Sequence, residues 1–257
     1  MRGPAGAPGT NGRGAADRLR DLARAEWGPL AYAVRARLRE RGPRALVLTA
    51  SSCLGILALQ LVQHAQGPGD WVDRLGGVYC TLPWWKALLR TPLSLFVPDP
   101  TLPVWGLLLQ VVVVFGISEA AIGAPRCLGI ALYATLAGTT FARYSLWAGP
   151  DGFLGLPVAD LVGRDTGPSA AVVALAVYVA CRYRAWWTAG AVILAMVIEV
   201  AALTNLAGCE HLTAIVAVLL LFGAETWWSG RRRPRRPSAP AGRTDRATSG
   251  TGRPPRG

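Results

Sequence analysis

The sequence predicts an all-α membrane protein in which six helices cross the bilayer. Hydrophobic residues make up 52% of its 257 residues and charged residues only 16%, whereas a soluble domain carries roughly 25% charged residues. Apolar segments of bilayer length follow one another through the middle of the chain, and the positive charge is concentrated at its two ends. This combination excludes a soluble globular domain, a single membrane anchor and a small disulfide scaffold.

Six apolar segments between residues 45 and 228 are the expected membrane helices. A spanning helix needs roughly 20 apolar residues, so the second segment is marginal and the fourth is too short. Tryptophans gather near the segment ends, as expected at a membrane interface. The segments are Ala45–His64, Leu102–Ser118, Cys127–Trp147, Pro168–Cys181, Ala185–Leu203 and Cys209–Trp228.

The distribution of charge predicts the orientation of these helices. Residues 1–44 contain ten arginines and four acids, residues 229–257 contain nine arginines and one acid, and residues 45–228 contain eight basic and ten acidic residues. Six crossings place both ends of the chain on one side, and the excess of arginine predicts that this side is cytoplasmic. We therefore expect a multi-pass protein of the plasma membrane whose basic ends face anionic lipid and not nucleic acid.

The same pattern divides the chain into three regions. Residues 1–44 form a basic cytoplasmic segment, in which residues 15–41 are predicted to fold as an arginine-rich amphipathic helix lying on the inner leaflet. Residues 45–228 are the membrane domain. Residues 229–257 are rich in arginine, proline, glycine and serine and are predicted to be a disordered tail.

Polar side chains inside the membrane segments are the functional candidates, because placing an ionisable group in a bilayer is costly. Most of them lie near segment ends, where a side chain can reach the interface. Glu210 is expected to be solvated at the start of the sixth segment, where a negative charge suits the helix dipole. The candidates are Glu119, Arg143, Glu199, Glu210, His211 and Glu225, with Gln110, Ser169 and Asn205 as neutral polar residues.

Ser169 and His211 share one depth, because the fourth and sixth segments both start at the outer face. Pro168–Cys181 is only about 21 Å long at 1.5 Å per residue, against a hydrocarbon core of about 30 Å. A central position would therefore sink Ser169 into a water-filled depression. A histidine base beside a serine nucleophile is the minimum for nucleophilic catalysis. Gly167 allows close backbone approach, and the helix-start N–H groups are suited to stabilise an oxyanion.

Ordinary structural roles are also open to this pair. Serine near a helix start is commonly a cap or a small packing residue. An imidazole close to a membrane surface can simply be interfacial. The residue types alone do not decide between catalysis and packing.

Three motifs resemble the rhomboid family of six-helix intramembrane serine proteases. GISEAAIGAPRCLGIALYATLAG resembles the end of the family's helix two and the start of helix three, RDTGPSAAVVAL resembles the Gly-x-Ser-Gly segment opening helix four, and NLAGCEHLTAIVAVLL resembles the part of helix six that carries the catalytic histidine. The matching residues are Gly116, Glu119, Gly123 and Arg126 in the first motif, Gly167 and Ser169 in the second, and His211 in the third.

The resemblance implies a Ser–His dyad in which Ser169 attacks a substrate carbonyl and His211 takes its proton. It implies no cofactor and no metal. Substrates would be other membrane proteins, cut in or near a transmembrane helix. Glu119 would be structural and would tie helix ends together.

Several residues depart from the rhomboid pattern. Ala170 stands in place of the last glycine of Gly-x-Ser-Gly, and Ala214 and Val218 stand where glycines follow the catalytic histidine. Small residues at these positions let helices approach closely. A valine is expected to push the fourth and sixth segments apart.

The oxyanion donors of the family are also missing from the second segment. The histidine and asparagine that supply them should fall near Pro103 and Leu107, and neither residue has a side-chain donor. Gln110 is the only amide on this segment and is the candidate substitute.

Two functions are therefore expected: an intramembrane serine endopeptidase, or a catalytically inactive rhomboid-like protein that binds client transmembrane helices. The sequence does not name the substrate or the oligomeric state. Cys80 and Cys209 both fall outside the membrane in this topology, and whether they pair is left open.

Overall fold

The computed structural model of the chain describes residues 14–65, 70–99, 103–157, 168–203 and 205–231, and every regular element in these ranges is a helix. The N-terminal helices are α1 (Ala15–Arg41), the 3₁₀ turn η1 (Gly42–Leu46), α2 (Val47–Ala65), α3 (Asp70–Gly76) and α4 (Trp84–Ser94). They are followed by α5 (Val104–Gln110), the π-helical segment η2 (Val111–Phe115), α6 (Gly116–Ile122), α7 (Ala124–Ala148), α9 (Ser169–Arg182), α10 (Trp186–Ala202) and α11 (Leu206–Arg231).

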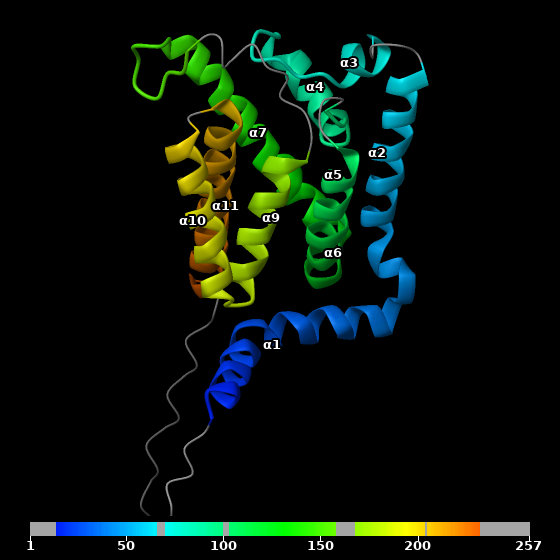
Figure 1. Cartoon of the computed structure of the whole chain (residues 1–257), viewed down its shortest axis with the longest axis vertical. Coiled ribbons are helices and arrows are strands. Elements are labelled where there is room, and N and C mark those ends of the chain that lie inside the picture. The colour runs from blue at the N-terminus through cyan, green and yellow to red at the C-terminus, as the bar shows by residue number, and fades with distance from the viewer. Residues whose placement is uncertain (1–13, 66–69, 100–102, 158–167, 204, 232–257) are drawn as a thin grey trace, which may run out of the picture.

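Each of the six predicted segments lies largely in helix, and these helices form a bundle (Figure 1). The end of the bundle next to α1 is called the lower end, and the opposite end, which carries α3 and α4, is called the upper end (Figure 1). Both short helices lie in a connection for which the sequence predicted no structure. The expected disordered tail lies almost wholly outside the described residues, except that α11 continues to Arg231.

Three helical stretches are long and apolar enough to cross a membrane, namely Ala15–Ala65, Val104–Ile122 and Leu206–Arg231. α9 and α10 are apolar but shorter. Large apolar side chains are exposed on the outside of the bundle, among them Leu194 and Ile198 of α10 and Leu220 of α11. An exterior of this kind is expected of a helical membrane protein.

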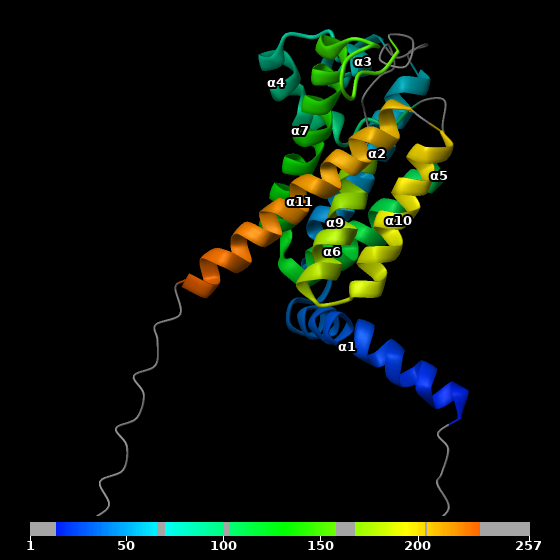
Figure 2. The ribbon, with the colours of Figure 1, turned by 90° about the vertical axis from the view of Figure 1, so that its left-hand side faces the viewer.

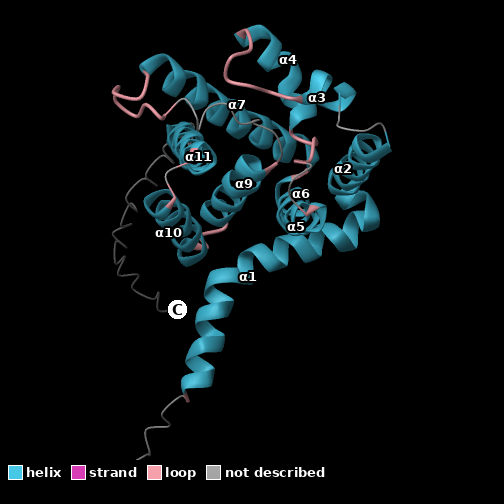
Figure 3. Ribbon diagram, turned by 45° about the horizontal axis from the view of Figure 1, so that its top comes forward, coloured by secondary structure: helices cyan, strands magenta, loops and turns pink. Residues whose placement is uncertain are grey.

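α9 is the central helix of the bundle. It contacts α6, η2, α7, α10 and α11, and Figure 3 shows it surrounded by these helices. Nine of its fourteen residues are buried, whereas α10 has one buried residue. Because α9 is short, its upper end lies below the upper ends of α7 and α11 (Figure 1).

Glu119 joins α6 to the start of α2. Its carboxylate accepts hydrogen bonds from the backbone N–H groups of Leu48 and Thr49, at 2.8 and 2.7 Å, and from the Thr49 hydroxyl at 2.8 Å. These N–H groups are in the first turn of α2, where a helix has no partners of its own for them. Glu119 is 2% exposed, so the carboxylate replaces the water that would otherwise satisfy both donors.

Gly123 forms the tight connection between α6 and α7. Its φ of +86° lies in the region that favours glycine, and its N–H donates to the Glu119 carbonyl at 2.8 Å. Pro125 follows at the second position of α7, where the lack of an N–H costs nothing. α7 therefore begins three residues before the predicted Cys127, at a turn that apolar content alone does not mark.

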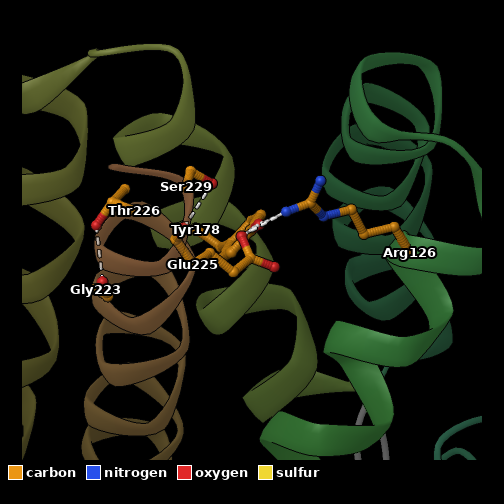
Figure 4. A network of polar contacts seen from close by, with 6 residues as sticks. All are labelled: Arg126, Tyr178, Gly223, Glu225, Thr226 and Ser229. Carbon is orange, nitrogen blue, oxygen red and sulfur yellow. Dashed lines mark hydrogen bonds and ion pairs between the residues drawn. The ribbon is translucent and has the colours of Figure 1, made fainter. Parts of the chain in front are cut away.

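Three helices are linked at the lower end by a polar network around Tyr178 of α9 (Figure 4). Arg126 of α7 donates to the Tyr178 hydroxyl and to the Glu225 carboxylate of α11, both at 2.5 Å. Tyr178 in turn donates to Glu225 at 2.6 Å. The network holds the lower parts of α7, α9 and α11 in register.

α1 lies across the lower end of the bundle and bends midway along its length (Figures 1 and 3). Pro29 lies inside the helix and accounts for the bend, because its ring cannot continue the hydrogen-bond ladder. The Glu26 carboxylate accepts from the Thr188 N–H at the start of α10 at 2.8 Å, and the Trp27 indole donates to the Thr188 hydroxyl at 2.9 Å. The predicted helix over residues 15–41 is confirmed, and these contacts dock it to the bundle.

Replacing Glu119 by alanine is expected to lower the free energy of unfolding by roughly 2–4 kcal/mol, because two buried N–H groups lose their acceptor. Glu119→Gln should cost less, since its amide oxygen still accepts. Reversible unfolding in mixed detergent micelles measures the change. The matched control is Glu40→Ala on the exposed surface of α1, expected within about 0.5 kcal/mol of the wild type. Equal stability of Glu119→Ala and Glu40→Ala would contradict the capping role.

Candidate functional site

Ser169 is the first residue of α9, and Pro168 precedes it at the N-cap position. The Ser169 side chain is half-buried. Gly167, which the sequence predicted as backbone support, lies outside the described residues. The first turn of a helix presents N–H groups without intrahelical partners, and these are next to the Ser169 hydroxyl along the chain.

His211 lies in the second turn of α11. The helix begins at Leu206, three residues before the predicted start, because the Asn205 side chain caps it by accepting from the Gly208 N–H at 2.8 Å. The His211 side chain is 12% exposed. Its Nδ1 is buried and has no hydrogen-bond partner among the described residues.

Ser169 and His211 both lie towards the upper ends of their helices. Tyr178 packs edge-on against Phe222 and donates to Glu225, and both helices run from the upper to the lower end (Figure 1). Ser169 lies nine residues before Tyr178.

Both residues lie on the faces through which α9 and α11 pack. Val173, one turn after Ser169, and Ile215, one turn after His211, belong to the same apolar cluster. The described part of the structure contains no hydrogen bond between the Ser169 hydroxyl and His211. Catalytic hydrogen bonds are often long or absent before substrate binds, so the arrangement is compatible with both roles considered for this pair.

Glu199 is the acidic residue next to His211. It lies in the last turn of α10, and its Oε2 is 4.0 Å from Nδ1 of His211. α10 and α11 run in opposite directions and converge at the upper end (Figure 2), which brings residues twelve positions apart together. The sequence marked Glu199 as an intramembrane acid but did not connect it to His211, because its partner depends on how α10 is rotated.

Glu210 points away from His211. It is 7% exposed, and a Cβ added to Gly138 of α7 would lie 3.3 Å from the Glu210 Cβ. The expectation that Glu210 is solvated is therefore wrong. The absence of a side chain at Gly138 leaves room for Glu210 against α7, while His211, the next residue, faces α10.

Gln110 does not lie on the inner face of its helix. It is exposed at the end of α5, whereas its neighbours Leu108 and Val111 are buried in the main core. The suggested role of Gln110 as an oxyanion donor is not supported by this position, because the helix presents Val111 to the core and turns Gln110 outward.

Val218 occupies the interface that the rhomboid pattern keeps open with glycine. It is fully buried, together with Ala214, in the core cluster that contains Leu175 and Tyr178 of α9. Because that cluster also contains Ile130, Ala131 and Ala134 of α7, the valine lies in the core shared by α7, α9 and α11.

Cys80 and Cys209 pack in one small cluster with Ala142 and Leu206 near the upper end. Neither is in a disulfide. Burial raises the pKa of the Cys80 thiol, which lowers its thiolate fraction at neutral pH. Within the described ranges, no group of three or more histidine, cysteine, aspartate or glutamate side chains is placed to hold a metal ion.

Comparison of the chain with protein-family models, curated proteins and solved structures gives no match. The resemblance to the rhomboid family therefore rests on the three sequence motifs alone. The geometry defines a helical membrane protein with a His211–Glu199 pair near the upper end of its bundle and Ser169 at the upper end of α9.

Proposed function

We propose that the protein is a six-span, rhomboid-like protein of the plasma membrane whose lower end is cytoplasmic. The six crossings are α2, the continuous stretch from α5 to α6, α7, α9, α10 and α11. Arg126, Arg182 and Arg184 lie at the lower end, beside the arginine-rich α1. This distribution supports the orientation, because cytoplasmic loops carry an excess of arginine.

The function that the geometry supports best is that of an intramembrane serine endopeptidase. The observation that carries it is the almost buried His211 imidazole near the upper end of α11, with Glu199 4.0 Å from its Nδ1. Ser169 is the first residue of α9, the neighbouring helix. A nucleophile, a base and a group that orients the base are the parts required for activating a serine. Glu199 extends the Ser–His dyad that the resemblance implies.

In this mechanism the Ser169 hydroxyl attacks the carbonyl carbon of a peptide bond, and Nε2 of His211 takes the hydroxyl proton. Glu199 favours the tautomer that carries its proton on Nδ1 and stabilises the imidazolium that forms. His211 then gives the proton to the leaving amine as the C–N bond breaks. Water, deprotonated by His211, hydrolyses the acyl-enzyme and restores Ser169.

The oxyanion would be stabilised by backbone N–H groups at the start of α9, since Gln110 points elsewhere. The short length of α9 supports access of water, because a start below the ends of α7 and α11 lies beneath the membrane surface. A substrate would be a membrane protein whose transmembrane helix unwinds at this level. No cofactor takes part in these steps.

A catalytically inactive protein that binds client transmembrane helices is the second candidate. Val218 favours it, because this fully buried valine stands where the rhomboid pattern has a glycine that lets helices approach closely. The exposed position of Gln110 favours it as well, since removal of one oxyanion donor typically lowers a rate by ~10²–10³.

A fluorophosphonate probe, which labels only activated serines, is expected to modify Ser169 in the detergent-solubilised protein. Ser169→Ala should abolish labelling, His211→Ala should slow it by ~10³ or more, and Glu199→Gln by up to ~10² because the imidazole loses its orientation. Gel fluorescence measures the rates. His64→Ala, Ser51→Ala and Glu40→Gln, all exposed, are the matched controls and should label as the wild type does. Labelling that persists in Ser169→Ala removes Ser169 from the nucleophile role.

Cleavage of a co-expressed single-span membrane protein distinguishes the two candidate functions. The endopeptidase predicts a shortened product that disappears in Ser169→Ala and His211→Ala but not in His64→Ala. Immunoblotting with tags on both ends of the substrate detects it. Co-purification of the intact substrate without any product, equal in all three variants, would favour the client-binding protein.

Topology is tested with single cysteines in a chain whose five native cysteines are replaced. Asp151→Cys, between α7 and α9, is expected to react with a membrane-impermeant maleimide added to intact cells. Ser229→Cys, near the end of α11, should react only after the cells are opened. Labelling of both positions from outside would contradict the six-span arrangement.

A further inference from the structure

A groove opens at the lower end of the bundle, between the ends of α7, α9, α10 and α11. Its volume is about 1240 Å³. α10 and α11 converge at the upper end and diverge towards this end (Figure 2), which makes room for it. Its charged and aromatic lining includes Arg126, Arg182, Arg184, Trp186, Phe222 and Trp228.

The charge of the groove is positive and only partly neutralised. Glu225 is the single acid among the described lining residues, and its carboxylate is already bonded to Arg126 and Tyr178. The side chains of Arg182 and Arg184 are exposed and make no hydrogen bond or ion pair with other described residues. Two guanidinium groups are therefore available to an anion.

Arg184 occupies a position that normally belongs to glycine. The turn after α9 is a Schellman motif, in which the Ala185 N–H donates to the Ala180 carbonyl at 2.8 Å and the Arg184 N–H donates to the Cys181 carbonyl at 3.2 Å. The motif requires a left-handed residue, usually glycine, and Arg184 has a φ of +65°. The chain keeps an arginine where glycine would relieve strain, which indicates a use for the side chain.

Apolar and aromatic side chains lie beside these arginines. Trp186 and Trp228 are 52% and 56% exposed, and Phe222 contributes a wall of the groove. Tryptophan concentrates at the headgroup level of membranes, where its ring is half in apolar and half in wet surroundings. A ligand with an anionic head and an apolar body fits this division.

We propose that the groove binds the headgroup phosphate of an anionic phospholipid, with Arg182 and Arg184 as the phosphate ligands and the aromatic wall against its acyl chains. Basic pockets between membrane helices are known to hold such headgroups. The lipid would come from the leaflet next to α1. Residues 231–257 of the chain are a poor occupant, because their nine arginines and one acid give them the same sign of charge as the groove.

Native mass spectrometry of the full chain in detergent tests the proposal with phosphatidylglycerol, phosphatidylcholine and inorganic phosphate as probes. Phosphatidylglycerol should bind at least fivefold more tightly than phosphatidylcholine, and phosphate should compete weakly. Arg182→Gln with Arg184→Gln should weaken phosphatidylglycerol binding by roughly 25-fold, about fivefold for each arginine. Arg18→Gln with Arg24→Gln on exposed α1 makes the same change in charge and should alter binding less than twofold.

Equal binding of the two lipids, or equal losses in the two double variants, would overturn the proposal. Displacement of phosphatidylglycerol by phosphate at comparable concentration would overturn the lipid as the source of the anion. Arg184→Gly separates binding from folding, because glycine suits the turn. It should keep or raise the melting temperature and still weaken phosphatidylglycerol binding about fivefold, and unchanged binding in this stable variant would contradict a role of Arg184 in lipid recognition.

Discussion

The burial of a short helix at the centre of the bundle is the constraint on which the rest of the arrangement depends. α9 has only fourteen residues and packs against five neighbouring elements. Its lower end is tied to α7 and α11 through Tyr178. Because the lower end is fixed, the length of α9 determines how far the helix extends upward. Its upper end, which begins at Ser169, therefore lies below the upper ends of α7 and α11. Depth in the bundle thus follows from helix length and one polar anchor.

Polar groups are divided between the two ends of the bundle. Those at the lower end are mostly satisfied: Glu119 caps α2, Glu26 caps α10, and Glu225 is shared by Arg126 and Tyr178. At the upper end, Nδ1 of His211 is buried without a hydrogen-bond partner in the described residues. Buried polar atoms are costly when left unsatisfied.

Catalysis and client binding make different demands on the upper part of the bundle. Val218 is buried in the core shared by α7, α9 and α11, while Ser169 and His211 lie nearer the upper ends of their helices, away from the network around Tyr178. An endopeptidase needs the Ser169 hydroxyl within reach of the His211 imidazole when substrate is bound. A client-binding protein needs only a surface against which a transmembrane helix can pack.

The sequence by itself determined the class of protein, the approximate positions of six apolar helices, the helix over residues 15–41 and the identity of the polar residues within the membrane segments. These are properties of consecutive residues, such as apolar content and charge. Only the tertiary structure decided which way each side chain points: Glu199 towards His211, Glu210 towards Gly138 and Gln110 outward. The physical reason is that a helix can be rotated about its axis without changing its sequence, and its rotation is set by packing against segments that are distant along the chain.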